Sequence, residues 1–224
     1  MEILKLGTVS TNHFLRRLHN LALGLGWLPW PVLPRKCWPE THWREKRAIR
    51  PDEHQRVLAA ERNPQWRLYL EILWETGAAQ TDAARLRRED IDSGEGTLSY
   101  MRCKTREWAT LKIGNRLAGL LDQLPASGPL FPSIAPMHDS RRAWHFARLC
   151  KRAGVKGVTL HSYRYAWAER ARAAGYPERW AQAALGHNSR AVHQAYARRA
   201  RVICPPLEEY EKRIVPFPKE AAVG

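Results

Sequence analysis

Cysteine, acidic residues and long apolar runs are all scarce in this sequence. The four cysteines are scattered and form no CxxC pair, which argues against a zinc ribbon or a disulfide framework and fits a reducing compartment. The stretch nearest to a membrane span, residues 21–33, is interrupted by Pro29 and Pro31 and is too short to cross a bilayer. We therefore expect a cytoplasmic protein without a signal peptide and without membrane association.

Acidic side chains are heavily outnumbered by basic ones. The 224 residues include 37 Lys and Arg against 22 Asp and Glu, which gives a formal charge of +15. Most of this excess lies in residues 140–201, where 14 basic residues stand against two acidic ones, a net charge of +12. Because a solvated helix face usually carries both signs interleaved, this segment predicts a surface that binds a polyanion.

The hydrophobic pattern indicates a globular, mostly helical protein. Hydrophobic residues make up 44% of the chain, which is enough for a core and excludes disorder. Runs 97–102 and 108–113 alternate as strands do, on either side of a turn at Cys103–Glu107. The predicted fold class is therefore mainly α with a small antiparallel β-hairpin sheet. Helical spacing predicts helices at 10–26, 51–62, 64–75, 79–88, 115–124, 139–153, 161–174, 177–185 and 189–201, and a short one at 207–213.

The chain divides into a short first part, a main part and a tail. A single helix at 10–26 cannot bury its own apolar side, and the Pro- and Trp-rich run 27–43 suits an extended linker. We expect residues 1–45 to be the last helix and linker of another domain, or a helix that docks elsewhere. Residues 46–204 are the expected main domain, and residues 205–224 a Pro-rich, charged tail.

Most of the candidate chemistry lies between residues 160 and 197. This segment contains an HxxR pair, His161 and Arg164, followed by a Leu-Gly-His triplet that ends at His187. Tyr196 follows nine residues after that histidine. Upstream, Thr76-Gly77 precedes an Asp-rich stretch, and Lys104 lies in the expected hairpin turn.

Taken in order, these motifs resemble the tyrosine recombinase, or phage integrase, family over about residues 47–213. The resemblance implies the catalytic-domain fold of that family. It also implies that residues 1–45 correspond to the final helix and linker of the family's separate core-binding domain. Any single motif is weak, whereas all of them at compatible spacing are specific.

The resemblance implies DNA recombination or integration through a 3′-phosphotyrosyl intermediate, as in mobile genetic elements. Tyr196 would attack the phosphorus, and the planar donor fork of Arg164 would stabilise charge on the non-bridging oxygens. His161 and His187 would add hydrogen bonds or proton transfer. Lys104 matches the family's catalytic lysine, which protonates the departing 5′ oxygen. Because the covalent link retains the energy of the phosphodiester, no metal, ATP or other cofactor is expected.

One position departs from the family pattern. The family has an arginine two residues after the glycine of its first motif, where this chain has Ala79. Loss of one charged donor costs on the order of 10²–10³ in rate, judged from single oxyanion-hole deletions. Gln80 adjoins the gap without bringing a charge, and Arg85, Arg87 and Arg88 lie about two helical turns further on. The site would then be slow, inactive, or completed by an arginine from another position. An inactive site would make the chain a non-catalytic DNA-binding regulator or a decayed mobile-element remnant.

The expected partner is double-stranded DNA, bound by salt-sensitive phosphate contacts. By the family resemblance, the protein would act as a homo-oligomer on DNA. A basic RNA-binding protein is an alternative on charge alone, although no RNP, KH or dsRBD pattern is present. The side chains predicted to contact DNA are Arg141, Arg142, Lys151, Arg152 and Arg190.

Each candidate also has an ordinary structural interpretation. Tyr196 is then a half-buried helix tyrosine, Arg164 a surface arginine and Lys104 a hairpin-tip lysine. His161 and His187 are then residues at helix ends. His138 and His193 lack any motif partner, and we interpret them as surface residues.

Overall fold

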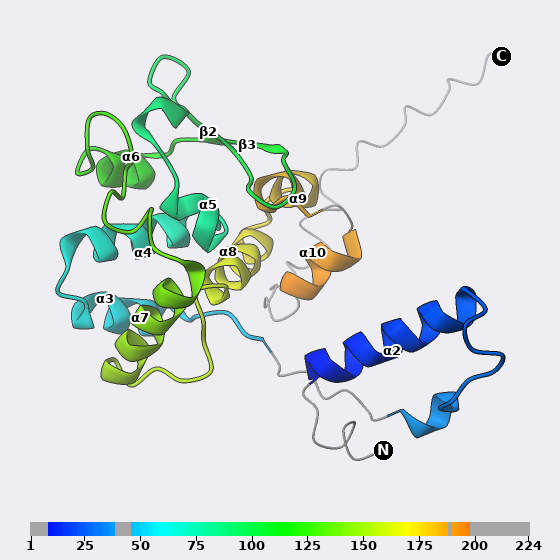
Figure 1. The fold of residues 1–224 in the computed structure, drawn as a ribbon. Coiled ribbons are helices and arrows are strands. Elements are labelled where there is room, and N and C mark those ends of the chain that lie inside the picture. Colours follow the sequence, from blue (N-terminus) through cyan, green and yellow to red (C-terminus); the bar gives the residue numbers. More distant parts are fainter. Residues whose placement is uncertain (1–8, 39–45, 188–189, 198–224) are drawn as a thin grey trace, which may run out of the picture. The chain divides into compact units, whose positions relative to one another are not determined.

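The computed structural model describes residues 9–38, 46–187 and 190–197. It divides into two compact units, Met1–Glu45 and Lys46–Gly224 (Figure 1). The smaller unit contains helix α2 (Val9–Gly24) and a 3-10 turn η1 (Arg35–Cys37). Phe14 and Leu21 on α2 are 65% and 54% exposed, so the apolar side of this helix is largely uncovered.

The larger unit is a helical domain that carries a small sheet at one edge (Figure 1). Helix α8 lies at its centre and packs against α4, α9 and α10. In chain order its elements are α3 (Pro51–Ala60), α4 (Pro64–Thr76), α5 (Gln80–Ala84), η2 (Arg88–Asp90), β1 (Ile91–Asp92), β2 (Thr97–Met101), β3 (Trp108–Lys112), α6 (Asn115–Leu121), α7 (Asp139–Arg152), α8 (Ser162–Ala173), α9 (Glu178–Leu185) and α10 (Arg190–Tyr196).

Helix α4 anchors the core, because seven of its 13 residues are buried. Its start is fixed by Asn63, whose side chain accepts hydrogen bonds from two backbone N–H groups, and by Pro64 in the first turn. Tyr69, fully buried, donates from its hydroxyl to the carbonyl of Gln80 at 2.8 Å. This contact places the start of α5 beside the core, next to the position of Ala79.

The strands form an antiparallel sheet in the order β1-β2-β3. In the hairpin, Leu98 pairs with Leu111 and Tyr100 with Ala109, so the buried residues of both strands share one face. The predicted fold class, mainly α with a small antiparallel sheet, is confirmed. The two-residue strand β1 was not predicted, because two residues are too few for an alternating pattern.

One predicted helix is shorter in the structure, and another cannot be compared with it. The helix predicted at 79–88 ends at Ala84. Beyond it the chain is extended, because Leu86 accepts a hydrogen bond from the backbone of Leu130 and Arg87 bridges to Pro129. The helix predicted at 207–213 lies outside the described residues. No helix within the described ranges has the length and apolar character needed to span a bilayer.

Candidate active site

The HxxR pair lies at the beginning of α8, the central helix. His161 is the residue just before the helix, and Arg164 follows one turn later, so both side chains leave α8 on the same side. Arg164 is 9% exposed because α4, α9 and α10 surround this end of the domain. The pair is therefore held by a helix that packs against three others.

Arg164 connects two motifs that lie far apart in the sequence. Its Nη1 donates to the carbonyl of Gly77 at 2.9 Å, and its Nη2 donates to the carbonyl of Leu185. Burial lowers the pKa of this guanidinium, while nearby Tyr196 opposes the shift. Since the pKa of an arginine starts far above neutrality, Arg164 remains a cation in the folded protein.

The first motif and the Leu-Gly-His triplet each have a glycine at or next to the carbonyl that accepts from Arg164. Gly77 has φ of 62°, and a Cβ there would lie 2.7 Å from Cγ of Trp167. Gly186 has φ of 65°, and a Cβ there would lie 2.6 Å from Nε of Arg102. The left-handed backbone and the close contacts together exclude any side chain at these two turns.

Helix α10 brings Tyr196 back onto the start of α8. Its hydroxyl lies 2.7 Å from Nε2 of His161. Its ring stacks on Tyr165, with centroids 4.3 Å apart, and lies 4.4 Å from the ring of His187. Residues 35 positions apart in the chain thus meet at one phenol oxygen.

Both histidines are uncharged at neutral pH. Burial lowers the pKa of His161 to about 4, and the charges of Arg164, Lys46 and Lys104 add to this shift. Burial also lowers the pKa of His187 to about 4, assisted by Arg164. With a neutral imidazole, Nε2 of His161 can accept the phenol proton of Tyr196.

These shifts predict that the protein loses stability as the pH falls from about 6.5 to about 4. An unfolded histidine titrates near 6.5, so in this window the unfolded chain binds more protons than the folded one. Above 6.5 both states are neutral and the contribution is complete. For a fully buried group a shift of this size corresponds to on the order of 3 kcal/mol, and solvent screening reduces the contribution of the partly exposed His187. Urea unfolding at pH 7.5 and 4.5 measures the loss, and the double variant His161→Gln/His187→Gln should show a flatter dependence. An equal slope in both proteins would contradict the prediction.

Lys104 lies in the turn between β2 and β3 and is exposed. The turn is fixed on one side by α5, because the carboxylate of Asp82 accepts a hydrogen bond from the backbone N–H of Cys103 at 2.9 Å. The ammonium charge of Lys104 contributes to the low pKa of His161. It therefore lies within electrostatic range of the His161–Tyr196 pair.

Arg102 is a site residue that the sequence analysis missed. It is 6% exposed, and its guanidinium donates to the carbonyls of Ala183 and Ala184 at the end of α9 and to that of Trp108 in the hairpin. Its charge acts on both Arg164 and His187. No local signal could have revealed it, because its partners on α9 lie more than 80 positions away.

Two arginines further along the first motif, Arg85 and Arg87, contact residues other than Ala79. Ala79 directly precedes α5 and is half-buried. Arg85 is exposed and lies 3.5 Å from the sulfur of Cys103, and Arg87 pairs with Glu89 at 3.0 Å. The buried cations that act on the pKa of His187 are instead Arg164 and Arg102.

The predicted DNA-contacting residues fall into three groups. Arg141, Lys151 and Arg152 are exposed on α7, and their spacing puts them on one side of the helix. Arg142 is 2% exposed and donates to the carbonyls of Ile134 and Met137 and to Asp139, so its prediction as a DNA contact was wrong. Arg190 is exposed and pairs with Glu178 at 3.3 Å.

The two histidines interpreted as surface residues have structural partners. His138 is the N-terminal cap of α7, where its ring accepts from the backbone of Ser140. His193 is 4% exposed and contacts His187, so its interpretation as a surface residue was wrong. Its position three residues before Tyr196 in a predicted helix was the signal that could have placed His193 on the same side of the helix as Tyr196. Among the described residues, no group of three His, Cys, Asp or Glu side chains is arranged to hold a metal ion.

Comparison with known proteins identifies relatives of the larger unit. Residues 47–201 match the model of the Phage integrase family. A search of curated proteins finds no match. A lambda integrase dimer bound to a COC' core site gives a TM-score of 0.71 at 19% identity, over 88% of this chain and 75% of that one. The catalytic domain of bacteriophage HP1 integrase gives 0.59 at 24% identity, over 79% and 99%.

Longer integrases are covered less completely. The integrase of mycobacterium phage Brujita gives a TM-score of 0.59 at 20% identity, over 87% of this chain and 73% of that one. This chain spans 61% of the lambda integrase chain in another dimer on the COC' core site. At these identities the structures agree on the fold, that of an integrase catalytic domain.

Proposed function

The chain belongs to the phage integrase family, as its motifs predicted, and on this premise we propose that it is a site-specific recombinase or integrase of double-stranded DNA. It cuts and rejoins strands through a 3′-phosphotyrosyl intermediate. The observation that carries the proposal is the 2.7 Å contact between the hydroxyl of Tyr196 and Nε2 of His161. A nucleophile and a neutral base meet there beside a buried guanidinium.

The reaction follows from these groups. The oxygen of Tyr196 attacks the phosphorus of the DNA, and its proton passes to Nε2 of His161. The bond from phosphorus to the 5′ oxygen breaks, and the ammonium of Lys104 gives that oxygen a proton. The products are a phosphotyrosyl diester and a free 5′ hydroxyl. The number of phosphodiester bonds is unchanged, so the step is reversible and needs no external energy source.

Arg164 stabilises the charge on the non-bridging oxygens. Its contacts with Gly77 and Leu185 use one N–H of each Nη atom, and each Nη carries a second N–H. Because backbone carbonyls hold the guanidinium, it need not reorganise when the transition state forms. Such fixed donors are more effective than a mobile side chain would be.

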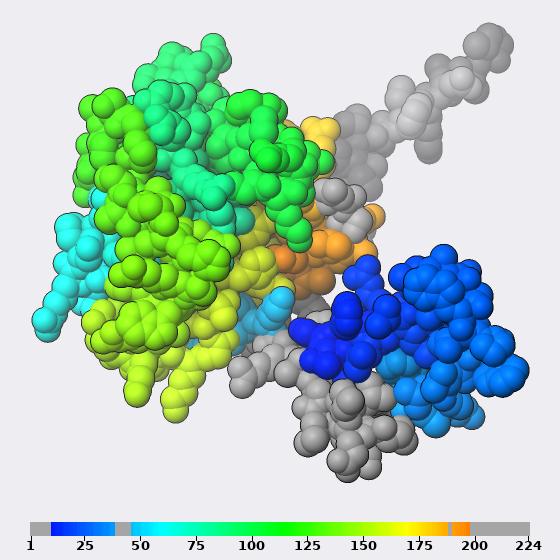
Figure 2. Space-filling view, in the orientation of Figure 1, coloured from blue at the N-terminus to red at the C-terminus, as the bar shows by residue number. Residues whose placement is uncertain are grey.

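DNA is bound by the exposed side of α7, which carries Arg141, Lys151 and Arg152. Figure 2 shows this helix open on the surface of the larger unit. Arg148 lies on the same side and stacks over Trp144 at 4.6 Å. Phosphate contacts of this kind release counterions, so affinity should fall steeply as salt rises. Arg190 is a weaker candidate because Glu178 already neutralises it.

The domain organisation and the assembly form part of the proposal. We infer that residues 46–204 are the catalytic domain, that residues 1–45 supply a helix and linker of a core-binding domain, and that residues 205–224 form a tail. Support comes from the division of the chain after Glu45 and from the 99% coverage of the HP1 catalytic domain. Lambda integrase structures contain dimers and a tetramer on a Holliday junction, and we propose that this chain also oligomerises on DNA.

Incubation with nicked suicide DNA substrates tests the activity. A panel of core-site sequences is needed, because the target sequence is set by contacts outside the catalytic residues. A covalent adduct that survives denaturation and disappears after proteolysis is the expected result. Absence of the adduct with every substrate, together with retained DNA binding, would favour a second candidate function: a non-catalytic DNA-binding regulator. The specific observation in favour of that candidate is Ala79 in place of the first-motif arginine.

Substituting Ala79→Arg should accelerate adduct formation by on the order of 10². Residue 79 lies two positions from Gly77, whose carbonyl receives Arg164, and its backbone (φ −65°, ψ 146°) accepts any side chain. The new guanidinium would add a charged donor at the phosphate. Ala79→Met is the matched control, with a long side chain and no charge. Equal single-turnover rates for both variants would show that position 79 does not reach the phosphate.

A further inference from the structure

His193 lies on the same side of α10 as Tyr196, three residues earlier in the helix. It is 4% exposed, and its Nδ1 lies 3.3 Å from Nδ1 of His187. The two ring centroids are 5.5 Å apart with planes inclined at 52°. One helix therefore supplies both the phenol and an imidazole that contacts the histidine of the Leu-Gly-His triplet.

His187 is held from two sides, and one of its ring nitrogens has no hydrogen-bond partner within the described residues. Its backbone N–H donates to the carbonyl of Gln182 at 3.0 Å, in the turn that follows α9. Its Nδ1 contacts His193, and its ring lies 4.4 Å from that of Tyr196. Its Nε2 is buried and has no hydrogen-bond partner within the described residues. A buried nitrogen without a partner next to the phenol is suited to a ligand atom that arrives with the substrate.

Two Nδ1 atoms can share a hydrogen bond only if one of them carries the proton. If His187 carries it, a neutral His187 turns a bare Nε2 lone pair toward the site, which repels a phosphate oxygen. If His193 carries it, Nδ1 of His187 accepts and its own proton lies on Nε2, which can donate to that oxygen. The identity of the donor within the pair thus decides whether His187 attracts or repels an anion.

The charges around the two rings differ. The groups that face His187 are Arg164, Arg102, His161 and His193, and all of them lower its pKa. Burial lowers the pKa of His193, Arg172 adds to this shift and Glu178 opposes it. Both rings are therefore neutral near pH 7, and a single proton lies between the two Nδ1 atoms.

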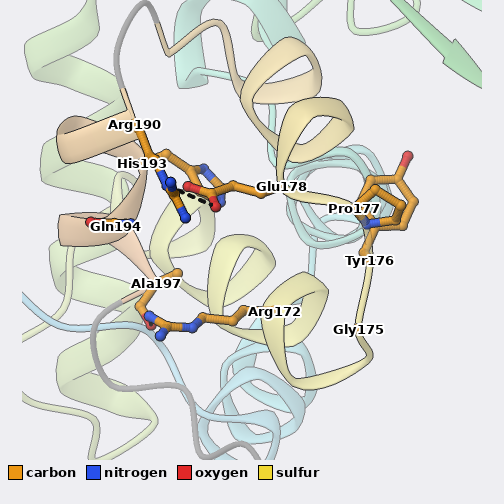
Figure 3. Close-up of a pocket in the computed structure, with 9 residues that line it drawn as sticks. All are labelled: Arg172, Gly175, Tyr176, Pro177, Glu178, Arg190, His193, Gln194 and Ala197. Atoms are coloured by element: carbon orange, nitrogen blue, oxygen red, sulfur yellow. Dashed lines mark hydrogen bonds and ion pairs between the residues drawn. The ribbon is translucent and has the colours of Figure 1, made fainter.

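The opposite side of His193 lines a pocket of about 350 Å³ between the end of α8, α9 and α10 (Figure 3). Glu178 and Arg190 also line this pocket and form an ion pair across it at 3.3 Å. His193 therefore separates a polar pocket from the site around Tyr196.

We propose that His193 is a positioning residue, which donates from Nδ1 to Nδ1 of His187 and so holds His187 with Nε2–H toward a phosphate oxygen of the DNA. The inference rests on the proposed strand-transfer function. It assigns His193 a role in the orientation and tautomer of His187, with no contact between His193 and the substrate.

Two nearly isosteric substitutions test this role. His193→Leu removes the hydrogen bond, whereas His193→Asn keeps an N–H donor near the position of Nδ1. We expect His193→Leu to lower the single-turnover rate of adduct formation by about 10- to 100-fold with unchanged DNA affinity, as for other groups that orient an imidazole. His193→Asn should recover most of the rate. Equal rates for the two variants would overturn the proposal, because a packing role alone does not distinguish them.

Nitrogen-15 NMR of histidine-labelled protein reports the tautomer without DNA. In the wild type we expect the Nδ1 of His187 to lack a proton and its Nε2 to carry one, and in His193→Leu a mixture of both forms. Wild-type protein with the proton on Nδ1 of His187 would refute the role of His193. Should the wild type form no adduct on any substrate, the proposed function fails, and the tautomer measurement alone then decides whether His193 orients His187.

Discussion

Replacement of Tyr196 by phenylalanine should abolish the covalent protein–DNA adduct. The change removes only the hydroxyl that lies 2.7 Å from His161, and the ring can keep its stacking on Tyr165 at 4.3 Å. Loss of one hydrogen bond costs stability only about 1 kcal/mol. The folded protein and its DNA binding should therefore persist while the nucleophile is absent. A denaturing gel of the suicide-substrate reaction, alongside an equilibrium DNA titration, measures both properties.

Tyr165→Phe is the matched control for this experiment. Tyr165 carries a second phenol, and its ring stacks on that of Tyr196. A difference in adduct formation between the two variants therefore reports which of the two hydroxyls attacks the phosphorus. The control should form the adduct at a rate near that of the wild type. An adduct that survives in Tyr196→Phe and is lost in Tyr165→Phe would show that Tyr165, and not Tyr196, is the nucleophile.

Arg164→Lys should slow adduct formation by on the order of 10²–10³. Lysine keeps the positive charge but loses the planar fork, so it cannot reach the carbonyls of Gly77 and Leu185 and a phosphate together. Because those two carbonyls lose their donors, the free energy of unfolding should also fall by roughly 1–3 kcal/mol. Single-turnover kinetics and urea unfolding separate the two effects.

Arg142→Lys controls for the loss of stability. Arg142 is another fully buried arginine that donates to backbone carbonyls, on α7 rather than at the site. The substitution should lower the free energy of unfolding to a similar extent and leave the rate of the folded protein unchanged. Equal rate losses in both variants would mean that Arg164 acts only on the fold.

The sequence predicted the helical fold and the chemistry-bearing motifs because both depend on local spacing. His161 and Arg164 are three residues apart at a helix start, and Lys104 lies in a turn bounded by alternating runs. The sequence could not predict the burial of Arg142, since charge counting treats every arginine of a basic segment as a surface residue. Its burial depends on the carbonyls of Ile134 and Met137 in the preceding loop, which the guanidinium reaches only in the folded chain.

Arg102 and His193 escaped prediction for a related reason. The partners of Arg102 lie at the end of α9, and only the folded hairpin brings them within reach. His193 lies on α10 and His187 in the turn after α9, so no period within a single element relates the two residues. Their roles arise from the way that α9 and α10 close over α8, which local patterns do not encode.

The carbonyl contacts of Arg164 and Arg102 have a consequence for the order of events on DNA. Two like charges brought together in a low-dielectric interior repel one another, and here the backbone dipoles of Gly77, Leu185 and the last turn of α9 offset that repulsion before any DNA arrives. The guanidinium groups of Arg164 and Arg102 are thus held in place in the free protein. On the proposed function, an incoming duplex would meet two cations that are already in position, and the choice of the phosphate that is cut would depend on register along the DNA rather than on a rearrangement of these two side chains.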